Sequence, residues 1–502
     1  MNERSDFGGH QTSGFVGLSV PRVELGAKSS WSSWCLAAIL LVGVVIVLAD
    51  GLSRPLLLEE DWVSSEAMTY EPNYAAFVFG FAMLPLMLTY GSSTGISKKE
   101  TVLLWFVMCT VAYAKDFSYM AVPGIPVFVT DVVLCVLSLA LWRSLRSGLR
   151  SLGRTLGLAM IWLFVSGAIC VSRGFLSGQE KVLVLRDSAI VVYSMFLLIG
   201  FLIVSSWESV KRFCLFFALG AAFSSLSALA WFLMQPGQRR YISYGPYILS
   251  ALLGSIILTT SRLIRPALGW LLSGILALGV LLANARTIYV ALTLMLLIMV
   301  FIGQSAKLRV SRRALRLSAT AALAFACLVW TLMQTKGGAE FLDTTVTGIV
   351  SGTVDYADDG NANFRFLAWL EAGQRFVQDP VLGEGFGVPF SFELTEFDVR
   401  PHNTFLTILY KMGLLGFLPA MVMLAGFQWK GWNSLRMFHQ HPGAAFLYVL
   451  LLGQLVAYVY GTLNLLLESP FLASIFWLSV GVEMSLISLL RTSPQIAATE
   501  PA

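Results

Sequence analysis

Long blocks of apolar residues recur along almost the whole chain, and short polar segments separate them. Only 13% of the 502 residues are charged, whereas 57% are hydrophobic. A soluble domain has about 25% charged residues. The sequence therefore excludes an ordinary water-soluble enzyme and a disordered chain, and it predicts an all-α polytopic membrane protein.

A helix of about 20 apolar residues crosses a bilayer, and the apolar blocks predict about fourteen such spans. The predicted spans are residues 31–49, 73–90, 101–114, 125–142, 155–171, 188–206, 213–234, 241–260, 266–283, 287–303, 315–334, 404–428, 444–467 and 471–490. They divide the chain into a flexible tail (1–30), eleven spans (31–334), a long loop (335–401), three spans (402–490) and a second tail (491–502).

Most of the 34 Lys and Arg residues fall in alternate connections between these spans. Cytoplasmic loops of membrane proteins carry an excess of Lys and Arg. The pattern therefore predicts that both termini are cytoplasmic. Dropping one span would place the basic cluster at 143–154 or the one at 307–316 outside. The second cluster, RVSRRALR, looks like a nucleic-acid patch, but we interpret it as a topology signal and predict no nucleic-acid partner.

The loop 335–401 is long and acidic, and the predicted topology places it on the outer face. Apolar residues at helical spacing in Asn361–Val377 predict an amphipathic helix there. Pro380 and three glycines that follow it predict an irregular segment. Because long structured loops usually carry function, we expect the functional site on the outer side.

His402 and Asn403 lie where this loop enters the twelfth span, and His402 is the one histidine predicted on the outer face. A histidine here can be a polar anchor at the membrane interface, or it can act as a general base near neutral pH. Lys411 follows nine residues later, about 180° around a regular helix. We therefore expect Lys411 to lie away from any ligand of His402, and its removal to matter less.

Three arginines are also predicted on the outer side: Arg286 between two spans, Arg365 on the amphipathic helix, and Arg186 at the start of the sixth span. Arg286 either snorkels to the interface or faces a polar cavity. Trp369 shares a helix side with Arg365, and Asp187 either pairs with Arg186 or contributes to ligand binding.

Together these residues predict a site for an anionic, lipid-linked substrate. Arginine side chains bind phosphate oxygens in bidentate fashion, and a single histidine beside them suggests proton abstraction from an attacking group. Asp131 and Glu483 lie within predicted spans, where each either relays protons or makes a structural hydrogen bond.

Other motifs are discounted. The glycines of 383–387 follow no predicted strand, so a dinucleotide site is not expected. The stretch 355–360 lacks the acids that an EF-hand needs, although a looser cation site stays open. The six cysteines lie in apolar blocks and form no CxxC pair, so we expect neither metal nor disulfide there. No cofactor is predicted.

The order of the remaining motifs resembles the O-antigen ligase and polysaccharide polymerase superfamily, the Wzy_C-type membrane glycosyltransferases. The resemblance covers roughly residues 270–430. The motif residues are Arg286; Arg365 with Trp369; Asp379 and Pro380 with Gly383, Gly385 and Gly387; His402 with Asn403; and Gly413 with Gly416.

The resemblance implies a GT-C-like fold and an enzyme that transfers a glycan from undecaprenyl pyrophosphate to an acceptor sugar hydroxyl, with inversion and without a metal. The enzyme would lie in the bacterial inner membrane with its site facing the periplasm, and its partners would be this donor, an acceptor glycan or lipid core, and membrane lipids. Arg286 and Arg365 would hold the diphosphate and His402 would orient or deprotonate the acceptor, while Arg186, Trp369 and Asn403 would bind substrate. Twelve spans are usual in this family, which is the alternative to fourteen here. A transporter or flippase of lipid-linked glycans is the rival function, although no clear internal repeat supports it.

Overall fold

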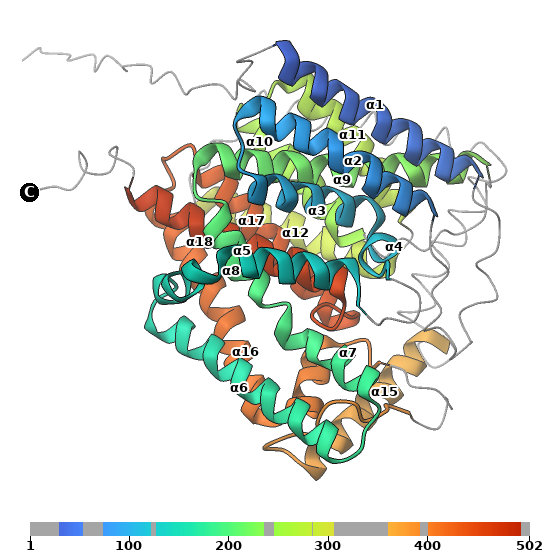
Figure 1. Cartoon of the computed structure of the whole chain (residues 1–502), viewed down its shortest axis with the longest axis vertical. Coiled ribbons are helices and arrows are strands. Elements are labelled where there is room, and N and C mark those ends of the chain that lie inside the picture. The colour runs from blue at the N-terminus through green and yellow to red at the C-terminus, as the bar shows by residue number, and fades with distance from the viewer. Residues whose placement is uncertain are drawn as a thin grey trace, which may run out of the picture.

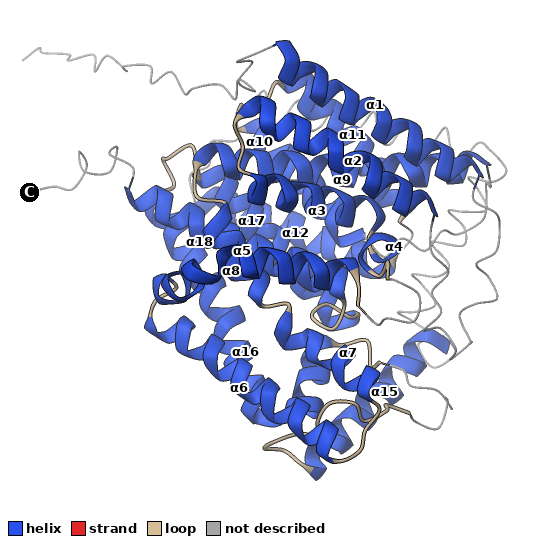
Figure 2. Cartoon of the chain, viewed as in Figure 1, coloured by secondary structure: helices blue, strands red, loops and turns tan. Residues whose placement is uncertain are grey.

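The computed structural model describes residues 30–53, 74–121, 127–234, 245–283, 285–305, 360–391 and 400–492. Almost all of this described part is α-helix (Figure 2). Within it, the one strand-like feature is an isolated antiparallel bridge between Ala121 and Phe128. The predicted all-α fold is therefore confirmed.

The described residues among the first 260 form ten helices, α1 to α10 (Figure 1). They are α1 (Ser30–Ser53), α2 (Tyr74–Thr94), α3 (Lys98–Tyr113), α4 (Lys115–Ser118), α5 (Val129–Ser151), α6 (Arg154–Leu176), α7 (Lys181–Val192), α8 (Met195–Ile203), α9 (Trp207–Met234) and α10 (Gly245–Thr260). The remaining helices are α11 (Pro266–Leu282), α12 (Arg286–Ser305), α15 (Gly360–Gln378), α16 (Thr404–Met437), α17 (Ala444–Leu463) and α18 (Pro470–Thr492).

Eight of the described helices are long and apolar enough to cross a membrane, and α7 with α8 adds a ninth span bent by 42°. A multi-pass membrane protein is thus confirmed, but the predicted number of fourteen is not. Every predicted span within the described residues coincides with a helix, yet α3, α10 and α11 have fewer than 18 residues and are shorter than a full span. The predicted span 315–334 lies outside the described residues.

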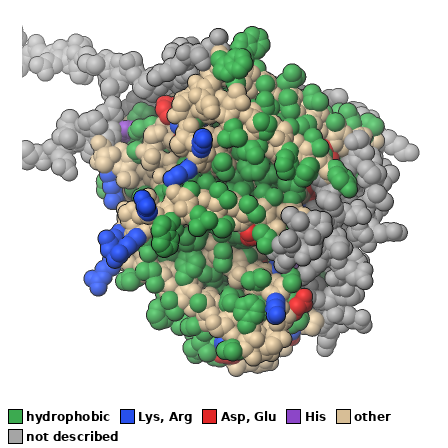
Figure 3. All heavy atoms as spheres, in the orientation of Figure 1, with side chains coloured by type: hydrophobic (Ala, Val, Ile, Leu, Met, Phe, Trp, Pro, Cys, Tyr) green, Lys and Arg blue, Asp and Glu red, His purple; other side chains and the backbone are tan. Residues whose placement is uncertain are grey.

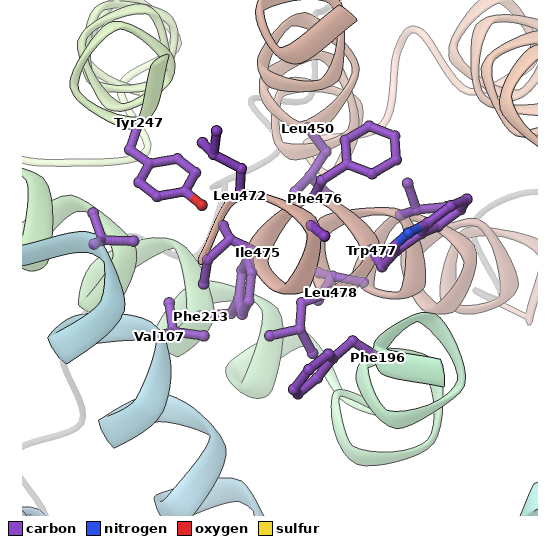
Figure 4. Close-up of a cluster of buried hydrophobic side chains, with 14 of the residues drawn as sticks. Val107, Phe196, Phe213, Tyr247, Leu450, Leu472, Ile475, Phe476, Trp477 and Leu478 are labelled. Carbon is purple, nitrogen blue, oxygen red and sulfur yellow. The ribbon is translucent and has the colours of Figure 1, made fainter. Parts of the chain in front are cut away.

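Helix α18 forms the centre of the bundle. Its side chains from Phe471 to Leu478 are buried, and Figure 4 shows Leu472, Ile475 and Leu478 pointing toward residues of several other helices. It packs against α8 most extensively, and also contacts α16 and α17. Helices α1, α2, α3 and α9 pack on one another on one side of α18, while α6 and α16 pair on the other (Figure 1).

The outer surface of the bundle is apolar. Large side chains such as Trp142 and Leu139 on α5 and Leu41 on α1 are exposed. Figure 3 shows hydrophobic side chains spread over this face of the molecule. Exposed apolar area on this scale is expected of a surface that contacts lipid.

Basic residues from separate loops meet at one end of the bundle. Lys99 donates a hydrogen bond to the carbonyl of Ala140 on α5 at 2.8 Å, and Arg212 pairs with Glu100 at 2.8 Å. Lys430, near the end of α16, lies 3.4 Å from the carbonyl of Leu152 between α5 and α6. These contacts bring together four connections that the charge pattern assigns to one side of the membrane. We refer to this end as the basic end.

The two acids predicted inside spans both make structural hydrogen bonds. Asp131 lies in the first turn of α5, where its carboxylate accepts from the backbone N–H of Phe128 and, at 2.8 Å, from the hydroxyl of Tyr193. Glu483 on α18 accepts from the amide of Gln454 on α17 at 2.8 Å. Gln454 in turn accepts from Gln428 on α16, so these polar groups join three helices.

Candidate active site

The segment 400–403 leads into α16, and each of its four residues makes a defined contact. The guanidinium of Arg400 pairs with Asp187 on α7 at 2.7 Å, and its carbonyl lies 2.9 Å from Nδ1 of His402. The carbonyl of Pro401 accepts from the indole N–H of Trp369 at 2.7 Å. The side-chain oxygen of Asn403 accepts from the backbone N–H groups of Phe405 and Leu406, the second and third residues of α16, each at 3.1 Å. The backbone is therefore held at four successive points.

His402 has an unusual backbone, with φ of 51°. Few non-glycine residues adopt this left-handed region, which costs of order 1–3 kcal/mol and is common at functional sites. The contacts of the neighbouring residues hold it there. The imidazole lies nearly perpendicular to the ring of Phe364, and the two ring centres are 6.0 Å apart.

The hydrogen bond to Arg400 determines which ring nitrogen of His402 carries the proton. A carbonyl can only accept, so Nδ1 must donate, and in the neutral ring Nε2 then keeps its lone pair. Burial lowers the pKa of His402 below the ordinary value, the positive charge of Arg365 lowers it further, and the bond to Arg400 opposes both effects. At neutral pH the ring is therefore neutral and able to accept a proton at Nε2.

Arg365 and Trp369 lie on α15, which corresponds to the amphipathic helix predicted from the sequence. It spans Gly360–Gln378, one residue more at each end than predicted. Ala368 and Ala372 are buried against Tyr410 and Phe390, and the Trp369 indole binds the turn before His402. These contacts fix Arg365 close enough to His402 to act on its charge.

Asn403 and Trp369 were predicted to bind substrate, which stays a prediction, and in the structure both make a positioning contact. The Asn403 oxygen caps α16 in the way that asparagine commonly caps helices. The single N–H of the Trp369 ring is used by Pro401. Any substrate contact must therefore use the Asn403 amide group or the face of the indole.

Helix α16 is broken at Gly413, where φ is 56° and ψ is −165°. The segment 379–391 fills the break. The N–H groups of Glu384 and Gly385 donate to the carbonyls of Tyr410 and Lys411 at 2.8 and 3.0 Å. A Cβ atom at Gly383 would lie 2.5 Å from the backbone nitrogen of Gly413, so only glycine fits where the two chains meet.

Lys411 lies on α16 just before this break and is joined to Arg400 through Asp187. Its side chain is 2% exposed, and its ammonium nitrogen lies 2.9 Å from Glu384 and 3.3 Å from Asp187. It also donates to the carbonyl of Val388. The break lies beyond Lys411 and leaves its separation of about 180° from His402 unchanged, so the smaller effect expected for Lys411 stays a prediction. The break instead makes room for 379–391, which carries Glu384 to the lysine.

Asp187 connects these groups, because one oxygen pairs with Arg400 and the other with Lys411. The backbone N–H of Gly387 also donates to it, at 2.9 Å. Of the two alternatives for Asp187, pairing with Arg186 or ligand binding, the structure gives a third, since its direct ion pairs are with Arg400 and Lys411. Arg186, the preceding residue on α7, is half-buried and acts electrostatically on Asp187 and Tyr119.

Arg286 is the first residue of α12, and its side chain lies outside the described residues. The next residue, Thr287, accepts from the amide of Asn464 at 3.1 Å. Asn464 begins the turn that also holds Glu468, whose carboxylate accepts from the hydroxyl of Thr404. The start of α12 and the start of α16 are thus joined through one turn, so the backbone at Arg286 lies at the same end of the bundle as His402.

The sequence did not identify Arg400, Glu384 or Lys411 as members of this region. A charged residue within an apolar block needs a buried partner, and that signal was available for Lys411. Arg400 and Glu384 looked like ordinary loop charges. In the described part of the chain, no three His, Cys, Asp or Glu side chains gather in a way that could hold a metal ion.

Comparison with known proteins agrees with the resemblance seen in the motifs. No curated protein matches the chain. Residues 271–421 match the model of the O-antigen ligase family, and this range includes Arg286, Arg365, Trp369, His402 and Asn403. The match supports glycan transfer in polysaccharide biosynthesis by a membrane glycosyltransferase-type enzyme. The part of the chain that begins within α11 and ends within α16 is therefore similar to the O-antigen ligase family.

Proposed function

We propose that this protein transfers a glycan from undecaprenyl pyrophosphate to a sugar hydroxyl at the periplasmic face of the bacterial inner membrane. The product is either a lipid-core-linked O-antigen or a longer polysaccharide, since ligation and polymerisation use the same donor. The observation that carries the proposal is a neutral His402, its Nδ1 bound to a carbonyl, next to Arg365 within the part of the chain similar to this family.

In the proposed reaction, the acceptor hydroxyl attacks the anomeric carbon of the donor sugar while its proton passes to Nε2 of His402. The bond from that carbon to the pyrophosphate oxygen breaks, and undecaprenyl pyrophosphate leaves with the electron pair. One displacement inverts the anomeric centre. Arg365 and Arg286 neutralise charge that develops on the leaving group, a role that fixed cations in a water-poor site perform well. No metal ion is required in this scheme.

The positive charge of Arg365 links donor binding to the basicity of His402. In the empty site, the guanidinium disfavours a proton on the imidazole. A diphosphate bound to Arg365 would cancel this charge, and His402 would then accept a proton more readily. The base is consequently strongest when the donor is present, which disfavours unproductive chemistry before both substrates are bound.

The test is product formation by the purified full chain in detergent, supplied with an undecaprenyl-pyrophosphate-linked glycan and a defined acceptor. Loss of a general base costs about 10²–10⁴-fold in rate, so His402→Ala should lose that much while remaining folded. His441→Ala is the matched control, because His441 is a loop histidine between α16 and α17. Equal rates for His402→Ala and the wild type would remove the base from this proposal.

A second experiment separates enzyme from transporter. If liposomes containing the protein translocate the lipid-linked glycan and no joined product forms with any acceptor, the protein is a flippase. Deletion in the source organism then separates the two enzymes. Bare lipid core with long lipid-linked chains indicates a lost ligase, and single-repeat products indicate a lost polymerase.

A further inference from the structure

A groove of 410 Å³ lies at the basic end, far along α16 from His402. Its walls come from the last turns of α16, the first turn of α6 and the end of α18. None of the candidate site residues lines it. A ligand in this groove would therefore not take part in the proposed reaction.

The groove is apolar along its length. Leu156, Val422, Trp429 and Met437 line it, and the last three are 44%, 70% and 66% exposed. Gly426 lets α16 approach α6 closely, since a Cβ atom there would lie 2.6 Å from the side chain of Leu156. The walls are therefore fixed by helix packing, and the opening faces the apolar surroundings of the bundle.

Two cations are among the residues that line this groove. Lys430 and Arg491 line it together and lie close enough for their charges to repel. The carboxylate that also acts on Lys430 is Glu483, which is fully buried and hydrogen-bonded to Gln454, so it does not enter the groove. Figure 3 shows more Lys and Arg side chains gathered where α18 ends and α5 turns into α6.

An apolar groove lined by two cations and an exposed tryptophan matches the parts of a phospholipid. Tryptophan is enriched at the level of the headgroups, and basic pockets between helices on the cytoplasmic side bind anionic headgroups. A zwitterionic headgroup would bring its own cation next to Lys430 and Arg491. An anionic phosphodiester would instead relieve their mutual repulsion.

We propose that this groove binds an anionic phospholipid such as phosphatidylglycerol, with its phosphate between Lys430 and Arg491 and an acyl chain along Val422 and Trp429. The positive-inside pattern predicts that this lipid comes from the cytoplasmic leaflet. The bound lipid would bridge α6, α16 and α18, and would thereby stabilise the basic end of the bundle.

The test is thermal unfolding of the full chain in a neutral detergent, titrated with either phosphatidylglycerol or phosphatidylcholine. We expect phosphatidylglycerol to raise the midpoint by several degrees more than phosphatidylcholine. The Lys430→Gln/Arg491→Gln variant should lose this difference. Arg146→Gln/Arg150→Gln removes two exposed charges from the same end but outside the groove, and should keep it. Native mass spectrometry should count one retained phosphatidylglycerol fewer in the first variant only.

Three results would overturn the proposal. Equal effects of the two lipids on the wild type would exclude selection by charge. Equal loss in both double variants would indicate diffuse attraction to the basic end rather than a site. The same stabilisation by glycerol phosphate, which has no acyl chain, would show a simple phosphate site. If Lys430→Gln/Arg491→Gln does not fold, single-residue variants and the lipid count by mass spectrometry take its place.

Discussion

The two lysines of α16 lie in opposite environments. Lys411 is 2% exposed and contacts two carboxylates, Asp187 and Glu384. Lys430 lies in an open groove beside another cation, Arg491, and its protein contact is a carbonyl at 3.4 Å. Lys411 is thus neutralised by carboxylates of the protein. Lys430, on the same helix, can pair with an anionic ligand.

This difference shows that a charged residue in an apolar segment can have either of two roles, which its burial and its partners distinguish. Removing one member of a buried ion pair leaves the other uncompensated and costs far more than removing an exposed charge. Lys411 is therefore expected to hold the candidate site together, whereas Lys430 is expected to matter for a ligand. The predictions below test the two ends against each other.

The largest loss of stability is expected from a substitution at Gly383, where the backbones of 379–391 and α16 are in direct contact. Gly383→Ala places a methyl group 2.5 Å from Gly413 at a residue with φ of 70°. The clash and the strained backbone should together cost roughly 4 kcal/mol or more, and little folded protein should be recovered. In Gly373→Ala the new methyl group on α15 meets nothing within 4 Å. Monodisperse yield after size exclusion should fall in the first variant alone, and equal yields would contradict the packing described.

Lys411→Met should be the next most severe change. It leaves Glu384 and Asp187 buried without their shared cation, which should cost about 3–5 kcal/mol in unfolding free energy. Thermal unfolding midpoints in detergent measure this. Adding Glu384→Gln to Lys411→Met should restore part of the loss, because it removes one of the two uncompensated acids. A double variant no more stable than Lys411→Met would argue against a shared ion-pair network.

The pH dependence of the proposed reaction should differ from that of an ordinary histidine. Burial and Arg365 lower the pKa of His402 in the enzyme without donor, so kcat/KM, which reports the free enzyme, should fall only when the pH drops below the usual midpoint near 6.5. Arg365→Gln removes one of the lowering effects. The midpoint of its residual activity should therefore move up toward 6.5. Burial also lowers the pKa of His441, but His441→Gln at the basic end should leave the rate profile unchanged.

The smallest effect is expected for Lys430→Met without added lipid. Substitutions of partly exposed charges usually change stability by less than about 0.5 kcal/mol. Its midpoint should therefore match the wild type in detergent and diverge only when phosphatidylglycerol is present. A large loss without lipid would mean that Lys430, like Lys411, is a structural charge.

The sequence predicted the helical class and the positions of the described spans because apolar blocks are a strong, local signal. It also selected Arg365 and His402, which the structure brings together. It could not predict the pairing of Lys411, because that depends on a left-handed glycine and on residues from α7 and 379–391. The role of Arg400 was also missed, since its partner Asp187 is more than two hundred residues earlier. The side chain of Arg286 and the span at 315–334 stay predictions.

The meeting of Gly383 with Gly413 has a consequence for the order of assembly in the membrane. The segment 379–391 leaves the ribosome before α16, yet its contacts are with α6, α7 and the interrupted part of α16: Arg173 holds the carbonyl of Gly383, and Asp187 holds the N–H of Gly387. It can reach its final place only after α16 has been inserted. A chain stopped before α16 would therefore contain every residue up to Asn403 and still present no formed turn around the imidazole of His402, so maturation of the catalytic region is expected to be a late, post-insertion event.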